Sequence, residues 1–177
     1  MNHQEKMTPG MRQKFILKLL KESQHPLKGN ELAKRTNVSR QVIVQDISIL
    51  KAKNEPILAT SQGYLYITKQ PNLVQHIIAV NHSPEETKKE LYLIVDHGVT
   101  VKNVIVEHPV YGEITASIMV STRAEVDQFI NKINSTNATY LSALTDGTHL
   151  HTLEADSMEN IKAACRELEK ERFLLDL

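Results

Sequence analysis

The chain has 177 residues, 41% hydrophobic and 24% charged, which suits a globular protein of one or two small domains. No apolar run approaches the ~20 residues of a membrane span, and the polar start lacks a signal peptide's apolar stretch. We therefore expect a cytoplasmic protein without a membrane partner. The single cysteine, Cys165, excludes an internal disulfide, and its spacing from Ile161 and Leu168 is typical of a packed helix face.

The net charge of zero conceals an asymmetry between the two parts of the chain. Residues 1–70 hold 12 Lys and Arg against 5 Asp and Glu, whereas residues 71–177 hold 9 against 16. The halves therefore carry about +7 and −7, which suggests two domains with different partners. The basic domain is suited to a polyanion.

The basic half predicts a helix-turn-helix. A first helix, about 11–23, ends at His25-Pro26, a short second helix covers about 29–36, and a third spans 38–53. Two short apolar runs around Ser61-Gln62-Gly63 then predict a hairpin over 56–67. Such a hairpin would be the wing of a winged helix-turn-helix.

The helix over 38–53 has two unlike faces. Ser39 is a suitable N-cap, and Ile43, Ile47 and Leu50 form a core stripe at about 100° per residue. The opposite face has almost no fixed charge, and its amide and guanidinium groups are those that pair with base edges in the major groove. An ordinary surface helix is the alternative. The candidate DNA contacts here and in the wing are Ser39, Arg40, Gln41, Gln45, Ser48, Lys51 and Gln62.

The acidic half alternates strands and helices after a predicted linker at 70–72. We expect a strand at 74–80, a helix opened by Ser83 and running to about 98, strands at 101–107 and 113–120, a helix at 123–134, a strand pair over about 139–155 and a last helix from Ser157 to about 172. This order predicts a ferredoxin-like split βαβ sheet. The fold class is therefore α+β, with a winged helix-turn-helix in 1–70 and a second domain in 71–177.

Four residues of the second domain have the chemistry of metal ligands. His149 and His151 are two apart in a predicted strand, so both point to one face and can converge on one ion. Taken alone, such a pair in a strand is more often a polar surface patch. His82 ends the first strand and Glu90 lies beside the apolar stripe of the next helix, where it can reach the sheet or form a surface pair with Lys89.

The chain resembles a known regulator family over its whole length. Residues 11–68, with SRQVIVQDI at 39–47 and ATSQGYLY at 59–66, resemble the biotin-repressor-like winged helix-turn-helix. The motifs NHSPEE at 81–86, VEHPVYGEI at 106–114 and THLHTLEA at 148–155 resemble the three-histidine (3H) domain. Joined in this order, they are similar to the niacin-responsive transcriptional repressors of Gram-positive bacteria.

The resemblance implies a metal site, an effector and a mode of control. His82, Glu90, His149 and His151 match the family's metal ligands, a set that suits zinc or nickel, with iron or cobalt as alternatives. His108, by itself a turn residue, and Tyr111 are implied near the pocket of the effector, nicotinic acid. We expect a homodimer on operator DNA, with half-sites about 34–36 Å apart. The residues leave open whether the effector is a co-repressor, which the family implies, or an inducer.

An enzyme is the competing hypothesis, because an open metal position can activate water. The sequence has no Gly-x-Ser-x-Gly elbow, no phosphate-binding glycine loop and no dedicated general base beside the ligands. We therefore expect a regulator rather than an enzyme. A metal-dependent hydrolase, or a metalloregulator that does not respond to niacin, remains the alternative.

Overall fold

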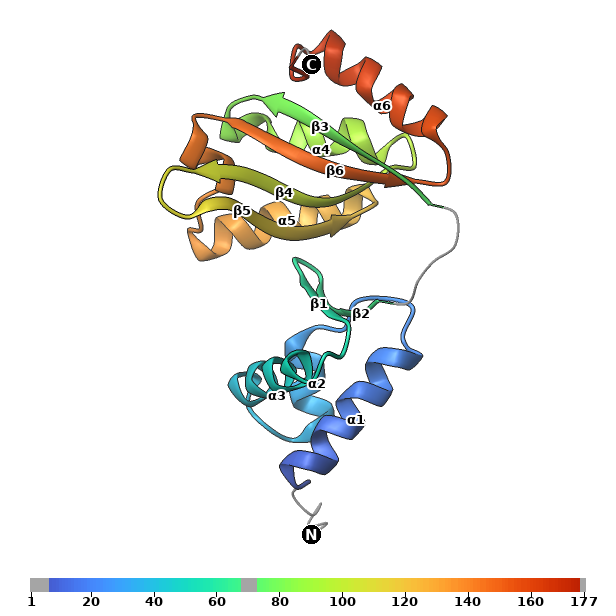
Figure 1. Ribbon diagram of the computed structural model, residues 1–177, viewed down its shortest axis with the longest axis vertical. Coiled ribbons are helices and arrows are strands. Elements are labelled where there is room, and N and C mark those ends of the chain that lie inside the picture. The colour runs from blue at the N-terminus through green and yellow to red at the C-terminus, as the bar shows by residue number, and fades with distance from the viewer. Residues whose placement is uncertain (1–6, 68–72, 176–177) are drawn as a thin grey trace. The chain divides into compact units, whose positions relative to one another are not determined.

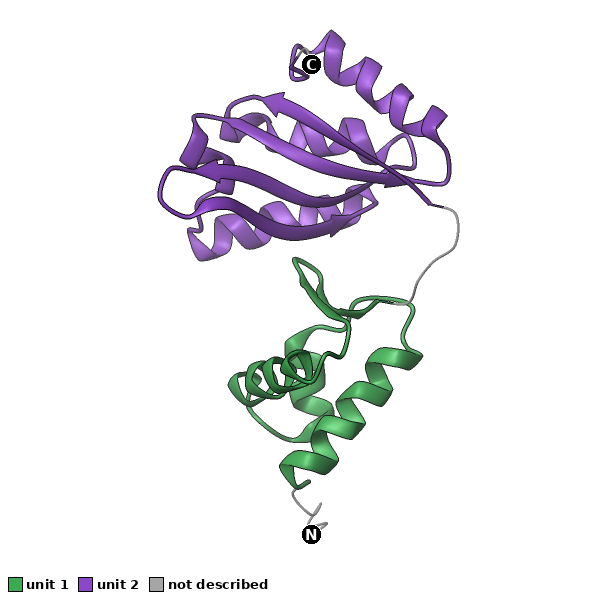
Figure 2. Ribbon diagram, in the orientation of Figure 1, with its two compact units in different colours: residues 1–69 green, residues 70–177 purple. Residues whose placement is uncertain are grey.

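The computed structural model describes residues 7–67 and 73–175 and divides the chain into two compact units, residues 1–69 and 70–177 (Figures 1 and 2). The predicted linker at 70–72 lies outside the described residues. None of the described helices has the length and apolarity needed to cross a membrane.

The first unit is the predicted winged helix-turn-helix. Its elements are α1 (Pro9–Glu22), α2 (Gly29–Thr36), α3 (Arg40–Ala52), β1 (Ile57–Thr60) and β2 (Gly63–Tyr66). The stripe Ile43, Ile47 and Leu50 packs in one core with Ile16 and Leu20 of α1, as the helical spacing predicts.

Two residues in unusual backbone conformations shape this unit. Asn37 ends α2 in the left-handed conformation, which asparagine tolerates, and the chain turns directly into α3. Gly63, at φ 137°, lets the wing approach Leu27, since a Cβ there would lie 2.5 Å from the Leu27 carbonyl oxygen. Leu27 and Tyr64 exchange backbone hydrogen bonds of 2.8 and 2.9 Å, so Leu27 extends the wing by one bridge.

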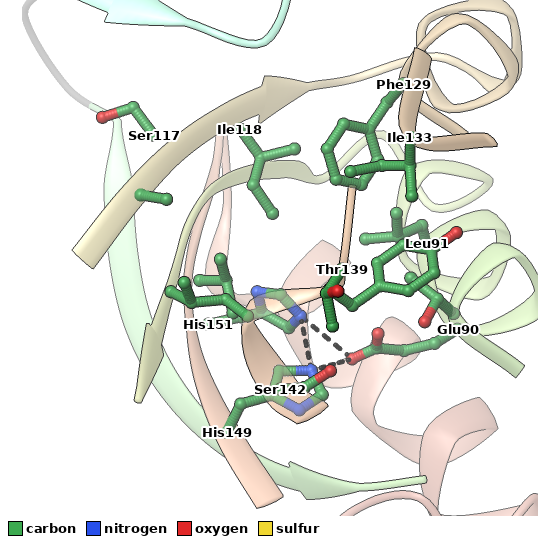
Figure 3. A pocket seen from close by; sticks show the side chains of 15 residues that line it. Glu90, Leu91, Ser117, Ile118, Phe129, Ile133, Thr139, Ser142, His149 and His151 are labelled. Atoms are coloured by element: carbon green, nitrogen blue, oxygen red, sulfur yellow. Dashed lines mark hydrogen bonds and ion pairs between the residues drawn. The ribbon is translucent and has the colours of Figure 1, made fainter. Parts of the chain in front are cut away.

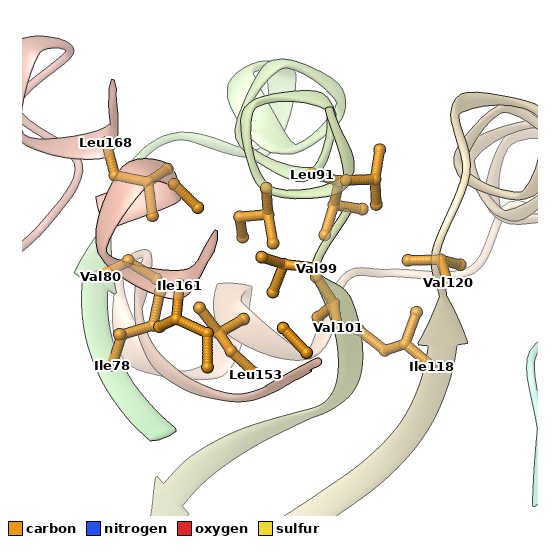
Figure 4. Packing of buried hydrophobic residues seen from close by; sticks show 14 of the residues in the cluster. Ile78, Val80, Leu91, Val99, Val101, Ile118, Val120, Leu153, Ile161 and Leu168 are labelled. Carbon is orange, nitrogen blue, oxygen red and sulfur yellow. The ribbon is translucent and has the colours of Figure 1, made fainter. Parts of the chain in front are cut away.

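The second unit has a four-stranded antiparallel sheet with helices packed against it. In chain order its elements are β3 (Val74–Asn81), the 3₁₀ turn η1 (Pro84–Glu86), α4 (Thr87–Val95), β4 (Thr100–His108), β5 (Gly112–Val120), α5 (Arg123–Thr136), the 3₁₀ turn η2 (Leu141–Thr145), β6 (Thr148–Ala155) and α6 (Met158–Lys170). The core forms where the strands meet α4 and α6, with contributions from Ile78, Val80, Leu91, Val101, Ile118, Leu153, Ile161 and Leu168 (Figure 4).

The strand order is β3-β6-β4-β5, with every neighbouring pair antiparallel. The α+β class and the split βαβ unit are as predicted, because β3 and β4 run parallel with one strand between them. The strand between them is β6. In the ferredoxin arrangement it would be β5, the third strand of the domain in chain order. In the observed order the first strand, β3, and the last strand, β6, are direct neighbours, and Ile78 is paired with His151.

The predicted strand pair over 139–155 is wrong. Only Thr148–Ala155 is a strand, and η2 occupies the earlier part of the segment. The turn ends with Asp146 and Gly147 in left-handed conformations, at φ 49° and 90°, which interrupt the extended backbone that a continuous strand pair needs. The helix predicted from Ser83 is a short 3₁₀ turn followed by α4, and Ser83 and Glu86 form its capping box.

Candidate metal centre and nucleic-acid interface

Helix α3 presents a polar face as the sequence predicts. The Ser39 hydroxyl accepts a hydrogen bond of 3.4 Å from the Val42 amide and caps the helix. Most of the candidate DNA contacts are exposed along this helix: Ser39, Arg40, Gln41, Gln45, Ser48 and Lys51. Val44 is also exposed, at 43%, and sequence reasoning missed it. An apolar side chain there can contact a thymine methyl group.

The inner side of α3 is attached to α1 by a buried polar cluster. Asp46, 2% exposed, accepts hydrogen bonds from Arg12 Nε at 2.5 Å, Arg12 Nη2 at 3.3 Å and Gln13 Nε2 at 3.1 Å. Lys53 Nζ donates to Gln13 Oε1 at 3.1 Å. The direction of the polar face of α3 therefore depends on a charge pair as well as on apolar packing.

Gln62 differs from the other candidate DNA contacts. It lies in the two-residue turn between β1 and β2, and it is buried. Its side-chain Nε2 donates a hydrogen bond to the Ser61 hydroxyl at 3.3 Å. A base contact by Gln62 would require this side chain to change its rotamer. The backbone of the wing turn is fixed by Thr60, whose hydroxyl donates to the Gly63 carbonyl oxygen at 2.9 Å.

The four candidate metal ligands converge in the second unit. His82 follows β3, Glu90 lies on α4, and His149 and His151 both point to the helix-covered face of β6. All four are buried, and Glu90 is 0% exposed. Glu90 Oε2 lies 2.8 Å from His82 Nε2, and its Oε1 lies 3.2 Å from His151 Nε2 and 3.7 Å from His149 Nε2. His149 Nε2 and His151 Nε2 are 3.1 Å apart (Figure 3).

These separations suit a tetrahedral transition metal. Bonds of about 2.0–2.1 Å place tetrahedral ligand atoms about 3.3 Å from one another. The ligand atoms of His82, Glu90 and His149 all lie within 4.8 Å of each other. His151 is outside this group of three, but its Nε2 lies 3.1 Å from His149 Nε2 and 3.2 Å from Glu90 Oε1. The residues present therefore fit a divalent transition metal ion.

The second nitrogen of each imidazole gives independent support for a metal. The three Nδ1 atoms lie 2.8, 2.8 and 2.6 Å from the carbonyl oxygens of Ser83, Gly147 and Asn103, for His82, His149 and His151 respectively. A carbonyl oxygen only accepts hydrogen bonds, so each Nδ1 carries the proton. Each neutral imidazole then directs an Nε2 lone pair inward, which is the arrangement that metal-binding histidines adopt.

Without a metal, protons must occupy part of this site. Burial lowers the pKa of His82 and of His151, but the Glu90 charge and its hydrogen bonds more than offset this effect, and both pKa values are raised. Burial raises the pKa of Glu90, yet the surrounding imidazoles hold it well below its usual value. Glu90 is therefore an anion at neutral pH, as a metal ligand must be.

A cavity of about 180 Å³ opens beside the ligands. Glu90, His149 and His151 line it together with residues that carry hydroxyl groups, among them Thr87, Ser117, Thr139 and Ser142. The rest of the wall is mainly apolar and includes Leu91, Val104, Ile118, Phe129 and Ile133, with Tyr140 alongside (Figure 3). A compact ligand with a polar group and an aromatic or aliphatic body matches this distribution.

The structure does not place His108 and Tyr111 at this cavity. They lie at the turn between β4 and β5, where their rings are 5.0 Å apart and Tyr111 is 78% exposed. His108 Nδ1 accepts from the Val110 and Tyr111 amides at 3.1 and 3.2 Å, so it acts as a turn residue. The expectation that these two residues contact the effector is not met by the cavity within one chain.

Sequence reasoning missed the cavity residues from the α5–β6 connection and from the start of α4. Thr87 could have been found, since it precedes Glu90 by three residues and shares its helix face. Tyr140 and Ser142 could not, because their segment was assigned to a strand pair.

Comparisons with known proteins agree with both units. An HTH domain model matches residues 12–65, and a 3H domain model matches residues 75–177. The chain is 58% identical to the transcription repressor NadR of Bacillus subtilis over 99% of both chains. The chain belongs to the niacin-responsive repressor family. It is 43% identical to a probable transcription repressor, NiaR, of Thermotoga maritima, over 93% of this chain and 94% of that one. It is a transcription repressor of this family, with a DNA-binding helix-turn-helix in its first unit.

Proposed function

We propose that the second unit binds a divalent transition metal through His82, Glu90, His149 and His151, and that nicotinic acid binds in the adjacent cavity to control repression. The observation that carries this proposal is the convergence of three buried Nε2 atoms on one carboxylate, with every Nδ1 directed to a carbonyl oxygen. The regulated genes would be those of niacin uptake or NAD synthesis, as the family membership suggests. Zinc and nickel suit the ligand set, with iron and cobalt as alternatives.

The cavity supports a small aromatic carboxylate as the effector. A metal with three imidazoles and one carboxylate keeps a net positive charge, which favours an anionic ligand over a neutral amide. The wall formed by Leu91, Ile118 and Phe129 suits the flat apolar sides of a pyridine ring. Nicotinate therefore suits both ends of the cavity, whereas nicotinamide lacks the charge.

The first unit would read an operator through α3 and the wing. Arg40, Gln41 and Gln45 would contact base edges, Ser39 and Lys51 phosphates, and Ser48 either. Gln62 would contact the DNA beneath the wing after a change of rotamer. A homodimer would present two such helices to half-sites about 34–36 Å apart. Effector binding would then act by changing the separation of the two helices.

The test is operator binding by fluorescence anisotropy, with the metal-loaded full chain and DNA from upstream of a niacin-uptake gene. We expect nicotinate to change operator affinity, and nicotinamide or a chelated protein to give no change. Arg40→Ala and Gln41→Ala should each cost roughly 1–3 kcal/mol on the operator and relax base preference. Lys51→Ala should weaken binding to all sequences and reduce the salt slope. A wild type without sequence preference would contradict the DNA assignment.

A metal-dependent hydrolase makes a different prediction. Such an enzyme needs a general base next to the metal-bound water. The one carboxylate lining the described cavity is Glu90, which already lies against three imidazoles. Turnover of an ester or amide by the metal-loaded protein, lost with the metal, would favour the hydrolase.

A further inference from the structure

Val44 is an apolar side chain on the polar face of α3. It is 43% exposed, and at about 100° per residue it falls between Lys51 and Ser48, next to Gln41. A single exposed valine is common on protein surfaces and by itself indicates nothing. Its position matters because α3 begins at Arg40, so Val44 lies in the N-terminal half of the helix. In helix-turn-helix proteins this half of the recognition helix meets the base edges.

The neighbours of Val44 leave its methyl groups uncovered. A helical side chain leans toward the N-terminus of its helix, so Ser48, one turn later, is the residue best placed to cover Val44. Ser48 is short, and its hydroxyl donates to the Val44 carbonyl oxygen at 2.9 Å, which holds it against the helix backbone. Arg40, one turn earlier, is turned toward α2, since a Cβ added at Gly29 would lie 3.5 Å from Arg40 Nε. Val44 therefore presents an apolar surface within a hydrogen-bonding face.

The charge around Val44 suits DNA. Asp46 is the only acidic residue of α3, and it is buried against Arg12. The exposed side of this helix therefore has no negative charge to repel phosphates, and residues 1–70 together carry about +7. An A·T pair presents adenine N6 and N7 to an amide in the major groove, and the C5-methyl group of thymine to an apolar side chain. The amides of Gln41 and Gln45 beside Val44 match both features.

We propose that Val44 packs against the C5-methyl group of one thymine in each half-site and so sets a preference for thymine at that position. This inference rests on the proposed function of α3 as the operator reader and adds a specificity-determining residue to it. Thymine is the one DNA base with a methyl group in the major groove, so an apolar contact distinguishes it from cytosine at the same place. Burial of one methyl group corresponds to roughly a fourfold change in affinity.

Replacement of thymine by uracil gives the sharpest test, because it removes the methyl group and keeps every hydrogen-bonding group of the base. The operator is located by footprinting upstream of a niacin-uptake gene, and each of its thymines is replaced singly by uracil. Affinity is measured by fluorescence anisotropy with the metal-loaded full chain at constant nicotinate. We expect uracil at one position per half-site to weaken wild-type binding roughly fourfold. Val44→Ala should weaken binding to the thymine operator to a similar extent, and the uracil replacement should then cost this variant little.

Ile49→Ala is the matched control. Ile49 is also an exposed β-branched residue of α3, at 42%, but it lies about 140° from Val44 around the helix. Its loss should leave the cost of uracil unchanged. Val44→Thr keeps one methyl group and should retain part of the thymine preference. Alanine is a better helix former than valine at an exposed position, so Val44→Ala should not lower the melting temperature.

Three outcomes would overturn the inference. If no thymine methyl group contributes to wild-type binding, or if uracil costs Val44→Ala as much as the wild type, Val44 makes no such contact. If Ile49→Ala reduces the uracil cost equally, the effect belongs to the docking of the whole helix. A wild type that binds the operator no better than unrelated DNA would overturn the proposed reading by α3 as well, so the two failures are distinguishable.

Discussion

Removal of the buried carboxylate at Asp46 should weaken the attachment of α3, the proposed DNA-reading helix, to α1. Asp46→Ala leaves the Arg12 guanidinium buried, at 10% side-chain exposure, without its partner, and the Gln13 amide loses an acceptor. Breaking a buried pair from one side costs about 3–5 kcal/mol, because the remaining charge stays desolvated. The loss should appear in hydrogen exchange of α1 and α3 amides in the full chain, which reports the opening free energy of the first unit.

Glu22→Ala is the control for this prediction. Glu22 pairs with Lys18 at 3.8 Å with both side chains more than 60% exposed, so its removal should cost about 0.3–0.5 kcal/mol. The double variant Arg12→Met with Asp46→Leu should recover part of the loss, since it leaves no unpaired charge buried between α1 and α3. A cost of Asp46→Ala no greater than that of the control would refute the reasoning.

Four further predictions concern the metal centre. The double variant His149→Ala with His151→Ala should lose its metal by elemental analysis but keep non-specific DNA binding, whereas Leu150→Ala, on the other face of the strand, should keep the metal. Gly147→Ala should lower metal affinity in a competition titration. Gly147 has φ 90°, and a Cβ there would lie 2.4 Å from the carbonyl oxygen of the metal ligand His82. As pH falls, the apparent metal affinity should begin to decrease above pH 6.5, the ordinary pKa of histidine, because protons compete for His82 and His151, whose metal-free pKa values are raised. Without metal, these groups stabilise the fold below pH 6.5 and lose this effect as pH rises through the raised pKa values, which pH-dependent urea unfolding would show. Wild-type metal affinity in Gly147→Ala, or an apparent metal affinity that begins to fall only well below pH 6.5, would contradict the described geometry.

Much of the first unit follows from local sequence signals. Helical spacing predicts Ile43, Ile47 and Leu50 as a core stripe, and they are 0%, 3% and 4% exposed. Gln62 and Gly63 at a short turn predict the wing. The attachment of Asp46 to Arg12 could not be predicted, because it joins residues 34 positions apart through tertiary packing.

In the second unit, the sequence predicts which face of the strand the two histidines share but not the tertiary contacts of their rings. Strand alternation places His149 and His151 on one face, and the structure brings them to His82 and Glu90 because β6 lies beside β3. The carbonyl partners of the imidazoles depend on strand register and turn geometry, which the sequence leaves open. Because residues 139–155 were predicted to be a strand pair, Ser142 was not recognised as a cavity residue. That prediction is wrong because the 3₁₀ turn η2 precedes β6, and Asp146 and Gly147 between them have positive φ angles.

One experiment tests the central claim directly: elemental analysis of the purified full chain, followed by calorimetric titration with nicotinate and with nicotinamide before and after metal removal. We predict about one transition metal ion per chain, for the one site of four ligands, with nicotinate binding that disappears on chelation and returns on reloading. Nicotinamide should bind far more weakly. Nicotinate binding of equal strength in the metal-free protein, or a chain purified without transition metal that does not take one up, would contradict the account.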